Sequence, residues 1–265
     1  IFLDPAVYGI FGIVAAVVDI LVYFSDIGLA AALIQKKNIS REDLSTTFIA
    51  QQILSALLLL IGFLTVNLVS GIYALSPAGI WLFKALLISF FLSSLKTIPS
   101  IKLERKLEFG KLIIPQILEN MVFYGTAVFF AWQGFGISAF TIAILLRSII
   151  GLIAIYIISP WKPSLHFNKE SFKSLVSFGA PFQINSLLGL IKDRLLVVYY
   201  GAVLPAANVG YLQWAERWSL FPLRIVVDNV NKVTFPAYSR LQDSKQHLVT
   251  AIEKSIFFTV LIIFP

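Results

Sequence analysis

Long apolar runs recur along the chain, and short polar segments separate them. Each run is close to the roughly 20 residues that a helix needs to cross a hydrocarbon core. The runs are continuous and rich in leucine, isoleucine and alanine, without the alternating polarity of a transmembrane β-strand. They therefore predict an all-α, polytopic transmembrane helix bundle. The predicted helices cover residues 6–25, 46–69, 79–98, 112–132, 137–158, 179–200 and 209–231, with a truncated helix from 255 to the end.

The composition agrees with this pattern and excludes a soluble globular domain. Of the 265 residues, 58% are hydrophobic and 13% are charged, whereas a soluble domain has about a quarter charged residues. Cysteine is absent, which excludes disulfides, thiolate metal sites and cysteine nucleophiles. The two histidines lie in predicted loops, and the sequence has no phosphate-binding glycine loop or nucleophile motif. We therefore expect neither an enzyme nor a cofactor or metal site.

Basic residues alternate between successive connections, which predicts the orientation in the membrane. Fifteen of the 21 basic residues lie near 35–45, 96–111, 160–175 and 232–254, and the connections near 70–78, 133–136 and 201–208 have none. The positive-inside rule places the basic connections in the cytoplasm and residue 1 outside, in a multi-pass protein of the cytoplasmic (inner) membrane. This explains most of the net charge of +7 through topology and contact with membrane lipids, so no nucleic-acid partner is expected.

Two short segments resemble each other and suggest an internal repeat. Leu3-Asp4-Pro5-Ala6-Val7-Tyr8-Gly9-Ile10 corresponds to Leu204-Pro205-Ala206-Ala207-Asn208-Val209-Gly210-Tyr211. Both segments open a helix that runs from outside to inside, so the repeat is parallel, with its axis along the membrane normal. By this repeat, a further helix is expected before Ile1, and about four more are expected after Pro265. The chain is then a piece of a longer protein.

Six basic residues remain after these connections are counted, and they lie within predicted helices, where a charge costs about 2.5–3.5 kcal/mol at the bilayer centre. Such residues usually face a partner or a wet cavity. Arg217, Arg224 and Asp228 share one face of their helix by their spacing. The six are Lys84, Arg147, Lys192, Arg194, Arg217 and Arg224.

Several of these charges also have a structural interpretation. Arg224 and Asp228 would neutralise each other, while Lys84 and Lys192 would extend to a membrane interface. Three deep acidic residues have two possible roles, either ion coupling or structural pairing with a cation. They are Asp19, Glu119 and Asp193.

Several motifs resemble those of the polysaccharide flippase family of bacteria and archaea, which exports O-antigen, exopolysaccharide or teichuronic acid precursors. This family belongs to the multidrug/oligosaccharidyl-lipid/polysaccharide exporter superfamily. The similar segments occur in the family's order and cover essentially the whole chain. They are Ser25–Gln35, Ile98–Phe109, Gly134–Gly136, Trp161–Pro163, Leu175–Gly179 and Phe235–Asp243.

The resemblance implies two pseudo-symmetric six-helix lobes that open alternately to either side of the membrane. The substrate would be an undecaprenyl-diphosphate-linked oligosaccharide, with a polysaccharide polymerase and glycosyltransferases as further partners. On this mapping the chain runs from about helix 2 to the start of helix 9. Residues 1–160 form most of the N-terminal lobe, 161–178 a cytoplasmic linker, and 179–265 the start of the C-terminal lobe.

Phosphate oxygens prefer arginine forks or lysine charges in a partly desolvated site. The expected substrate-binding residues are therefore Arg217, Arg224, Asp228, Arg147, Lys192 and Arg194.

Two other functions stay open at this point. A multidrug or small-molecule exporter of the same superfamily would use a cavity dominated by acidic residues, whereas the deep charges here are mainly basic. A membrane-embedded polymerase or glycosyltransferase usually needs a large extracellular loop, and the three predicted external loops are short.

Overall fold

The computed structural model describes residues 3–36, 38–164, 166–221 and 245–263, and every regular element among them is an α-helix. This confirms the predicted all-α bundle. The chain divides into two compact units, residues 1–210 and 211–265, which are described separately. The helices are α1 (Pro5–Tyr23), α2 (Leu29–Gln35), α3 (Arg41–Leu64), α4 (Val66–Ile72), α5 (Pro77–Ser94), α6 (Thr97–Arg105), α7 (Phe109–Trp132), α8 (Ser138–Ile158), α9 (Lys169–Val203), the helical residues 206–221, and α11 (Lys245–Ile263).

Five helices are long and apolar enough to cross a membrane, and they match the first five predicted spans. These helices are α1, α3, α5, α7 and α8. The second predicted span, 46–69, is two helices, because α3 ends at Leu64 and the short α4 follows. The described residues thus contain a multi-pass arrangement of transmembrane helices.

Helix α9, which corresponds to the sixth predicted span, 179–200, is longer than the apolar run predicts. The apolar run begins at 179, whereas α9 begins at Lys169 and takes in ten residues of the expected linker 161–178. Pro181 consequently lies inside α9 rather than in the first turn of a helix. The Asn168 side chain accepts hydrogen bonds from the backbone N–H groups of Glu170 and Ser171. This cap allows the polar segment to start the helix.

Local signals explain where the other helices start. Asp4 and Ser76 cap α1 and α5, and each is followed by a proline at the first helical position, where proline is best tolerated. Ser40 and Asp43 form a reciprocal capping box at the start of α3, so that two N–H groups without helical partners are satisfied.

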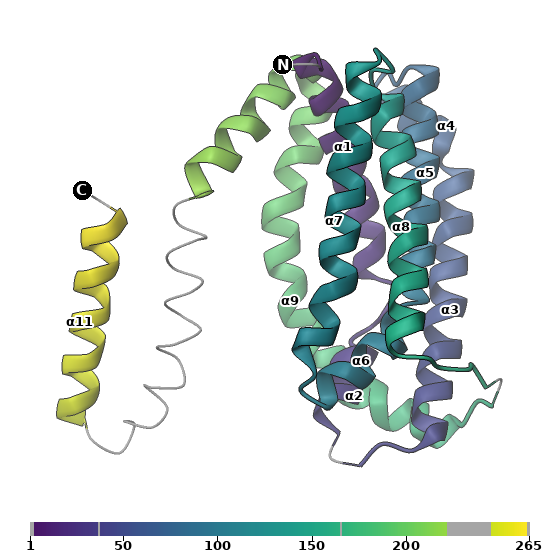
Figure 1. The fold of residues 1–265 in the computed structure, drawn as a ribbon, viewed down its shortest axis with the longest axis vertical. Helices are drawn as coiled ribbons and strands as arrows, with labels where there is room; N and C mark the ends of the chain where they lie inside the picture. Colours follow the sequence, from purple (N-terminus) through teal and green to yellow (C-terminus); the bar gives the residue numbers. More distant parts are fainter. Residues whose placement is uncertain (1–2, 37, 165, 222–244, 264–265) are drawn as a thin grey trace. The chain divides into compact units, whose positions relative to one another are not determined.

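The first unit is a bundle in which α5 packs against α1, α3 and α8, and α7 packs against α8. Figure 1 shows α2 and α6 at one end of this bundle, and α4 at the other end near the N-terminus. One apolar core joins α1 and α5 through Val14, Phe83 and Leu87. A second core, at the α2 and α6 end, includes Leu33 and Ile98.

Polar contacts gather at the α2 and α6 end, which we call the basic end. Arg105 of α6 donates to the carbonyl oxygens of Leu33, Ile34 and Lys36 at 2.6–2.8 Å. These carbonyls lie at the last turn of α2 and have no partner within their own helix. Arg105 therefore caps α2 and ties it to α6.

Asp43 joins three segments at the same end. Its carboxylate accepts hydrogen bonds from Lys36 at 2.8 Å, from the Ser40 N–H at 2.9 Å and from Ser171 of α9. The start of α9 is thereby bonded to the start of α3.

Helix α9 also follows α1 along its length. Gln183 and Tyr23 exchange hydrogen bonds near the basic end, and Arg194 pairs with Asp19 at 2.9 Å further along. At the far end of α1, a Cβ on Gly9 would overlap the carbonyl oxygen of Ala206, and one on Gly210 would overlap that of Pro5. The two segments of the predicted repeat thus touch reciprocally at their glycines.

This contact predicts that Gly9→Leu destabilises the protein. A side chain at residue 9 meets backbone atoms, which cannot rotate away, so the cost exceeds the roughly 1–3 kcal/mol of ordinary overpacking. The measurement is the melting temperature of the purified protein in detergent. Gly71→Leu in α4 is the matched control, because an added Cβ there meets nothing within 4 Å. Equal melting temperatures for the two variants would contradict the contact.

Candidate functional site

Three charged side chains from different segments meet in the first unit: Lys96 from the residues before α6, Glu119 from α7 and Arg147 from α8. The Lys96 Nζ donates to Glu119 Oε1 at 2.6 Å, and the Arg147 Nε lies 3.6 Å from Glu119 Oε2. The first distance is that of a strong charge-assisted hydrogen bond, whereas the second is too long for a hydrogen bond. Glu119 is therefore held mainly by Lys96, with Arg147 as a second, looser partner.

The break between α5 and α6 positions Lys96. Helix α5 ends at Ser94, and Lys96 is the residue that precedes α6. The Tyr156 hydroxyl of α8 donates to the Leu95 carbonyl oxygen at 3.2 Å. The Leu95 carbonyl oxygen, which lies just after the end of α5, therefore receives its hydrogen bond from α8. This bond holds the backbone beside Lys96 against α8, the helix that carries Arg147.

A glycine on α8 makes room for the carboxylate. A Cβ at Gly151 would overlap Glu119 Oε1, so only glycine lets the Glu119 side chain lie against the α8 backbone. The neighbouring Ser148 and Ser89 hydroxyls are 2.6 Å apart. This hydrogen bond joins α8 to α5 directly beside Arg147, so the helix that carries Arg147 is also bonded to the helix whose end precedes Lys96.

The cluster has one formal positive charge in excess, because two cations share one carboxylate. The Lys96 and Glu119 side chains are 18% and 12% exposed, whereas Arg147 is 43% exposed. No partner bonds the two terminal nitrogens of Arg147 among the residues that the structure describes. The Arg147 guanidinium also lies 5.6 Å from the centroid of the Phe123 ring, which holds a cation by its quadrupole. Arg147 is thus the member that is free to bind an anion.

These residues line a polar cavity of about 390 Å³. Its volume is within the usual range of ligand sites, roughly 300–1,000 Å³. Arg147 is the tenth residue of α8 and Glu119 the eleventh of α7, so both lie near the middle of a helix long enough to cross a membrane. The lining residues are Lys96, Ser100, Leu112, Pro115, Gln116, Glu119, Asn120, Arg147 and Ile155.

The structure brings some of the predicted site residues together and separates others. Arg147 and Glu119 share the cavity, while Asp19 and Arg194 form an ion pair between α1 and α9. Arg217 is exposed and lies in the second unit, within the helical residues 211–221.

The remaining predicted residues lie outside what the structure describes. Lys192 and Asp193 belong to α9, but their side chains are not described. Arg224 and Asp228 fall in the undescribed range 222–244. Their proposed roles therefore stay predictions.

Lys96 is the functional candidate that the sequence pattern missed. It ends an apolar run and is followed by further basic residues, so its position in the sequence assigns it to the connection 96–111 with the other cations there. A signal was nevertheless present, because Lys96 directly follows the apolar and small residues Phe91–Leu95, unlike the later cations of that connection. Its partner Glu119 is 23 positions away, and only the packing of α7 on α6 brings them together.

The geometry predicts unequal effects for the two cations. Lys96→Ala leaves the largely buried Glu119 without its hydrogen bond, which costs about 3–5 kcal/mol when one partner of a buried pair is removed. Arg147→Ala costs less, because its contact is longer and more exposed. Melting temperatures in detergent measure both effects. Adding Glu119→Gln to Lys96→Ala should recover much of the stability, and similar losses for the two single variants would argue against the assignment.

Comparison with known proteins identifies the family. The family model described as "Polysaccharide biosynthesis protein" matches residues 2–265. Among curated proteins, the teichuronic acid biosynthesis protein TuaB of Bacillus subtilis (strain 168) is 25% identical over 219 residues, which are 81% of this chain and 45% of TuaB. The lipopolysaccharide biosynthesis protein WzxC of Escherichia coli (strain K12) is 23% identical over 269 residues, 99% of this chain and 54% of WzxC.

A third relative is the amylovoran biosynthesis protein AmsL of Erwinia amylovora, 23% identical over 241 residues, 88% of this chain and 61% of AmsL. The chain spans about half the length of the curated relatives it matches. No solved structure matches the chain significantly. Because the family model matches residues 2–265, the chain belongs to the family of polysaccharide biosynthesis proteins.

Proposed function

We propose that the protein is a transporter that moves an undecaprenyl-diphosphate-linked oligosaccharide across the cytoplasmic membrane during polysaccharide biosynthesis. The observation that carries this proposal is the cavity with an excess positive charge and, near the middle of α8, an arginine whose terminal nitrogens have no bonding partner among the described residues. A diphosphate offers several anionic oxygens, which arginine binds in pairs. Gln116, Asn120 and Ser100 line the same cavity and supply polar groups for a head group.

The names of the relatives support a polysaccharide pathway. They refer to three different polymers, namely teichuronic acid, lipopolysaccharide and amylovoran. Because the three polymers differ, we infer that the protein recognises the lipid carrier, which different pathways can share, rather than one particular sugar. In this proposal, the glycosyltransferases that build the oligosaccharide and the polymerase that uses it are the functional partners.

The contacts of α1 support transport by alternating access. In the proposed division, α1 belongs to the first lobe (1–160), and the part of α9 from residue 179 onward belongs to the second (179–265), together with the helical residues 206–221. The lobes then touch at Gly9 and Gly210 at one end of α1, and at Gly28 and Gly179 near the other. Contacts without intervening side chains can open and re-form at low steric cost. We propose that they separate in turn, with the basic end in the cytoplasm.

Two deep carboxylates remain candidates for ion coupling. Asp19 and Glu119 are each paired with a cation, so a proton or metal ion would have to compete with Arg194 or Lys96. Asp193 is the third candidate of the same proposal. A multidrug exporter is the competing function, and it would require a cavity that favours cations. The two functions are separated by whether an anionic lipid-linked sugar or a cationic drug binds.

The proposal predicts that Arg147→Ala abolishes surface polysaccharide in cells that depend on this gene. The reason is that the cavity loses its free anion-binding group, while the Lys96 to Glu119 hydrogen bond remains. Surface polysaccharide is measured together with the amount of protein in the membrane. Lys84→Ala is the matched control, because Lys84 lies 4.8 Å from the Trp81 ring centroid and does not line the cavity. Normal export by Arg147→Ala at normal protein levels would refute the proposal.

A second prediction concerns Arg217 and Arg224, which share one helix face by their spacing in the sequence. Arg217→Ala and Arg224→Ala should each lower surface polysaccharide without lowering the amount of protein, because in this proposal each removes a cation that binds the substrate. The same export assay measures both variants. Wild-type export in both would remove these two residues from the proposed substrate site.

A further inference from the structure

Helix α6 ends in a turn that usually contains glycine, but the residue at that position is a leucine. The Leu107 N–H donates to the Glu104 carbonyl oxygen at 2.9 Å, and the Glu108 N–H donates to the Leu103 carbonyl oxygen at 3.0 Å. This pair of bonds is the Schellman motif, in which the residue after the cap is left-handed and is most often glycine. Leu107 has φ 57°, which strains a residue with a Cβ. The backbone disfavours leucine here, so a role for Leu107 has to come from its side chain.

The Leu107 side chain is exposed beside a second large apolar side chain and two lysines. Leu107 is 74% exposed, and Phe109, the first residue of α7, is 56% exposed. Lys106 and Lys111 are exposed as well. Lys111 pairs with Glu108 at 3.0 Å, whereas Lys106 has no ion pair with any residue whose position the structure gives. We call Lys106, Leu107, Phe109 and Lys111 the α6–α7 tip.

The length of α7 places this tip at the expected membrane surface. Figure 1 shows α6 at the end of the bundle where α7 begins. Helix α7 has 24 residues and is about 36 Å long at 1.5 Å per residue, whereas the hydrocarbon core is about 30 Å thick. The start of α7 therefore extends out of the core into the layer of head groups. Lysines in that layer meet lipid phosphates, and apolar side chains there reach the ends of the acyl chains.

We propose that the α6–α7 tip binds an anionic phospholipid at the membrane surface. Lys106 and Lys111 lie against its head group, while Leu107 and Phe109 insert among the adjoining acyl chains. Insertion removes exposed apolar area from water, which offsets the strain at Leu107. The inference goes beyond the proposed function and does not depend on which molecule binds in the cavity.

The charge of the segment argues for an anionic lipid rather than a zwitterionic one. Residues 102–111 include four basic and two acidic residues, so the segment is cationic. Basic residues close to a membrane surface are attracted by anionic lipids. Lys106, with no acidic partner of its own among the residues described, contributes most to this attraction.

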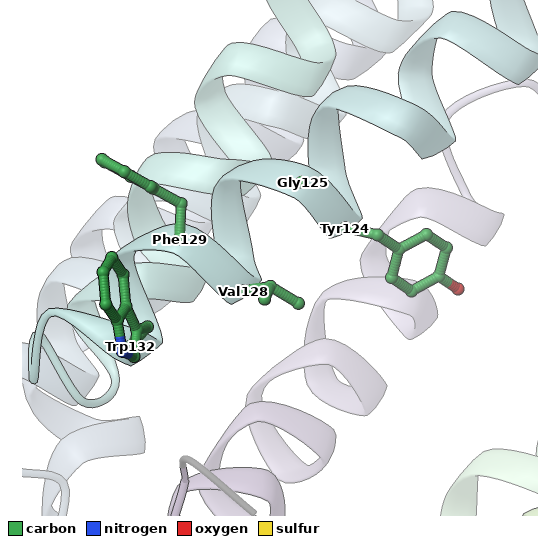
Figure 2. Close-up of a pocket in the computed structure, with 5 residues that line it drawn as sticks. All are labelled: Tyr124, Gly125, Val128, Phe129 and Trp132. Atoms are coloured by element: carbon green, nitrogen blue, oxygen red, sulfur yellow. The ribbon is translucent and has the colours of Figure 1, made fainter.

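The same charge distinguishes the tip from the other exposed apolar surface of α7. Tyr124, Val128 and Trp132 line an apolar hollow further along this helix, and Figure 2 shows the Val128 and Trp132 side chains projecting from it. Residues 112–146 contain no lysine or arginine. That surface has no charge by which to select a head group, so it provides the control.

Photo-crosslinking in nanodiscs with equal amounts of phosphatidylglycerol and phosphatidylcholine tests the inference. Phe109 is replaced by the photo-reactive amino acid p-benzoylphenylalanine, and mass spectrometry counts the adducts with each lipid. Val128 is the matched control position, since Phe109 and Val128 both lie on α7 and are both 56% exposed. The ratio of phosphatidylglycerol to phosphatidylcholine adducts should be at least about fivefold higher at residue 109, a difference of roughly 1 kcal/mol. In about 1 M salt, where the Debye length falls to about 3 Å, the two ratios should approach each other.

A lysine variant tests the charged part of the tip. Lys106→Ala should lower the adduct ratio at residue 109 several-fold, because it removes the cation that has no acidic partner among the described residues. Lys173→Ala is the matched control, since Lys173 is exposed near the start of α9 and does not belong to the tip. This control should leave the ratio at residue 109 unchanged.

A glycine variant separates insertion of the apolar side chain from folding. Glycine adopts the left-handed turn without strain, so Leu107→Gly should not lower the melting temperature in neutral detergent. It should lower the total lipid adducts at residue 109 several-fold, because the tip loses an inserted side chain. Unchanged adducts in this variant would show that Leu107 does not insert and would overturn that part of the inference.

The outcomes at residue 109 leave the proposed function untouched. Equal adduct ratios at residues 109 and 128 would mean that the tip does not select anionic lipid. Adducts at residue 109 only within the protein itself would mean that another part of the chain covers the tip. Either result would overturn the inference, while transport of the lipid-linked oligosaccharide would still be decided by the export assays.

Discussion

A charge among apolar helices has to be neutralised inside the protein, because lipid offers it no partner. The first unit is organised around this constraint at Glu119. Lys96 reaches it from the break between α5 and α6, Arg147 approaches it from α8, and Gly151 leaves the space that the carboxylate fills. The pair of Asp19 and Arg194 follows the same rule between α1 and α9. Each pair fixes which helices are neighbours and how far along their length they meet.

The same cluster also explains why this cavity is suited to an anion. One carboxylate does not satisfy two cations, and the shorter bond goes to Lys96. Arg147 is left with its terminal nitrogens unbonded among the described residues and with Phe123 beneath the guanidinium. Within this one cluster, Lys96 neutralises Glu119, and Arg147 is the cation suited to bind an anionic ligand.

Much of the fold could be predicted from local sequence. The apolar runs identify the five spanning helices, and capping residues such as Ser40 with Asp43 mark where a helix begins. The same reasoning misplaced the start of α9, because polar residues 169–178 contain no apolar run. Their helix is stabilised by the Asn168 cap and by the bond from Ser171 to Asp43. Lys96 was missed for a related reason, since a lysine at the end of an apolar run looks the same whether it faces water or a buried carboxylate.

The sequence by itself determined that the chain lives in a membrane, that its deep charges are the unusual residues, and which helices carry them. These properties depend on composition and on spacing within one helix, which are local. Only the tertiary structure decided which charge meets which, that the terminal nitrogens of Arg147 have no partner among the residues described, and that the segments around Gly9 and Gly210 touch. Those properties depend on contacts between helices far apart in the sequence. Helical periodicity determines the face on which a residue lies but contains no information about the helix that packs against that face.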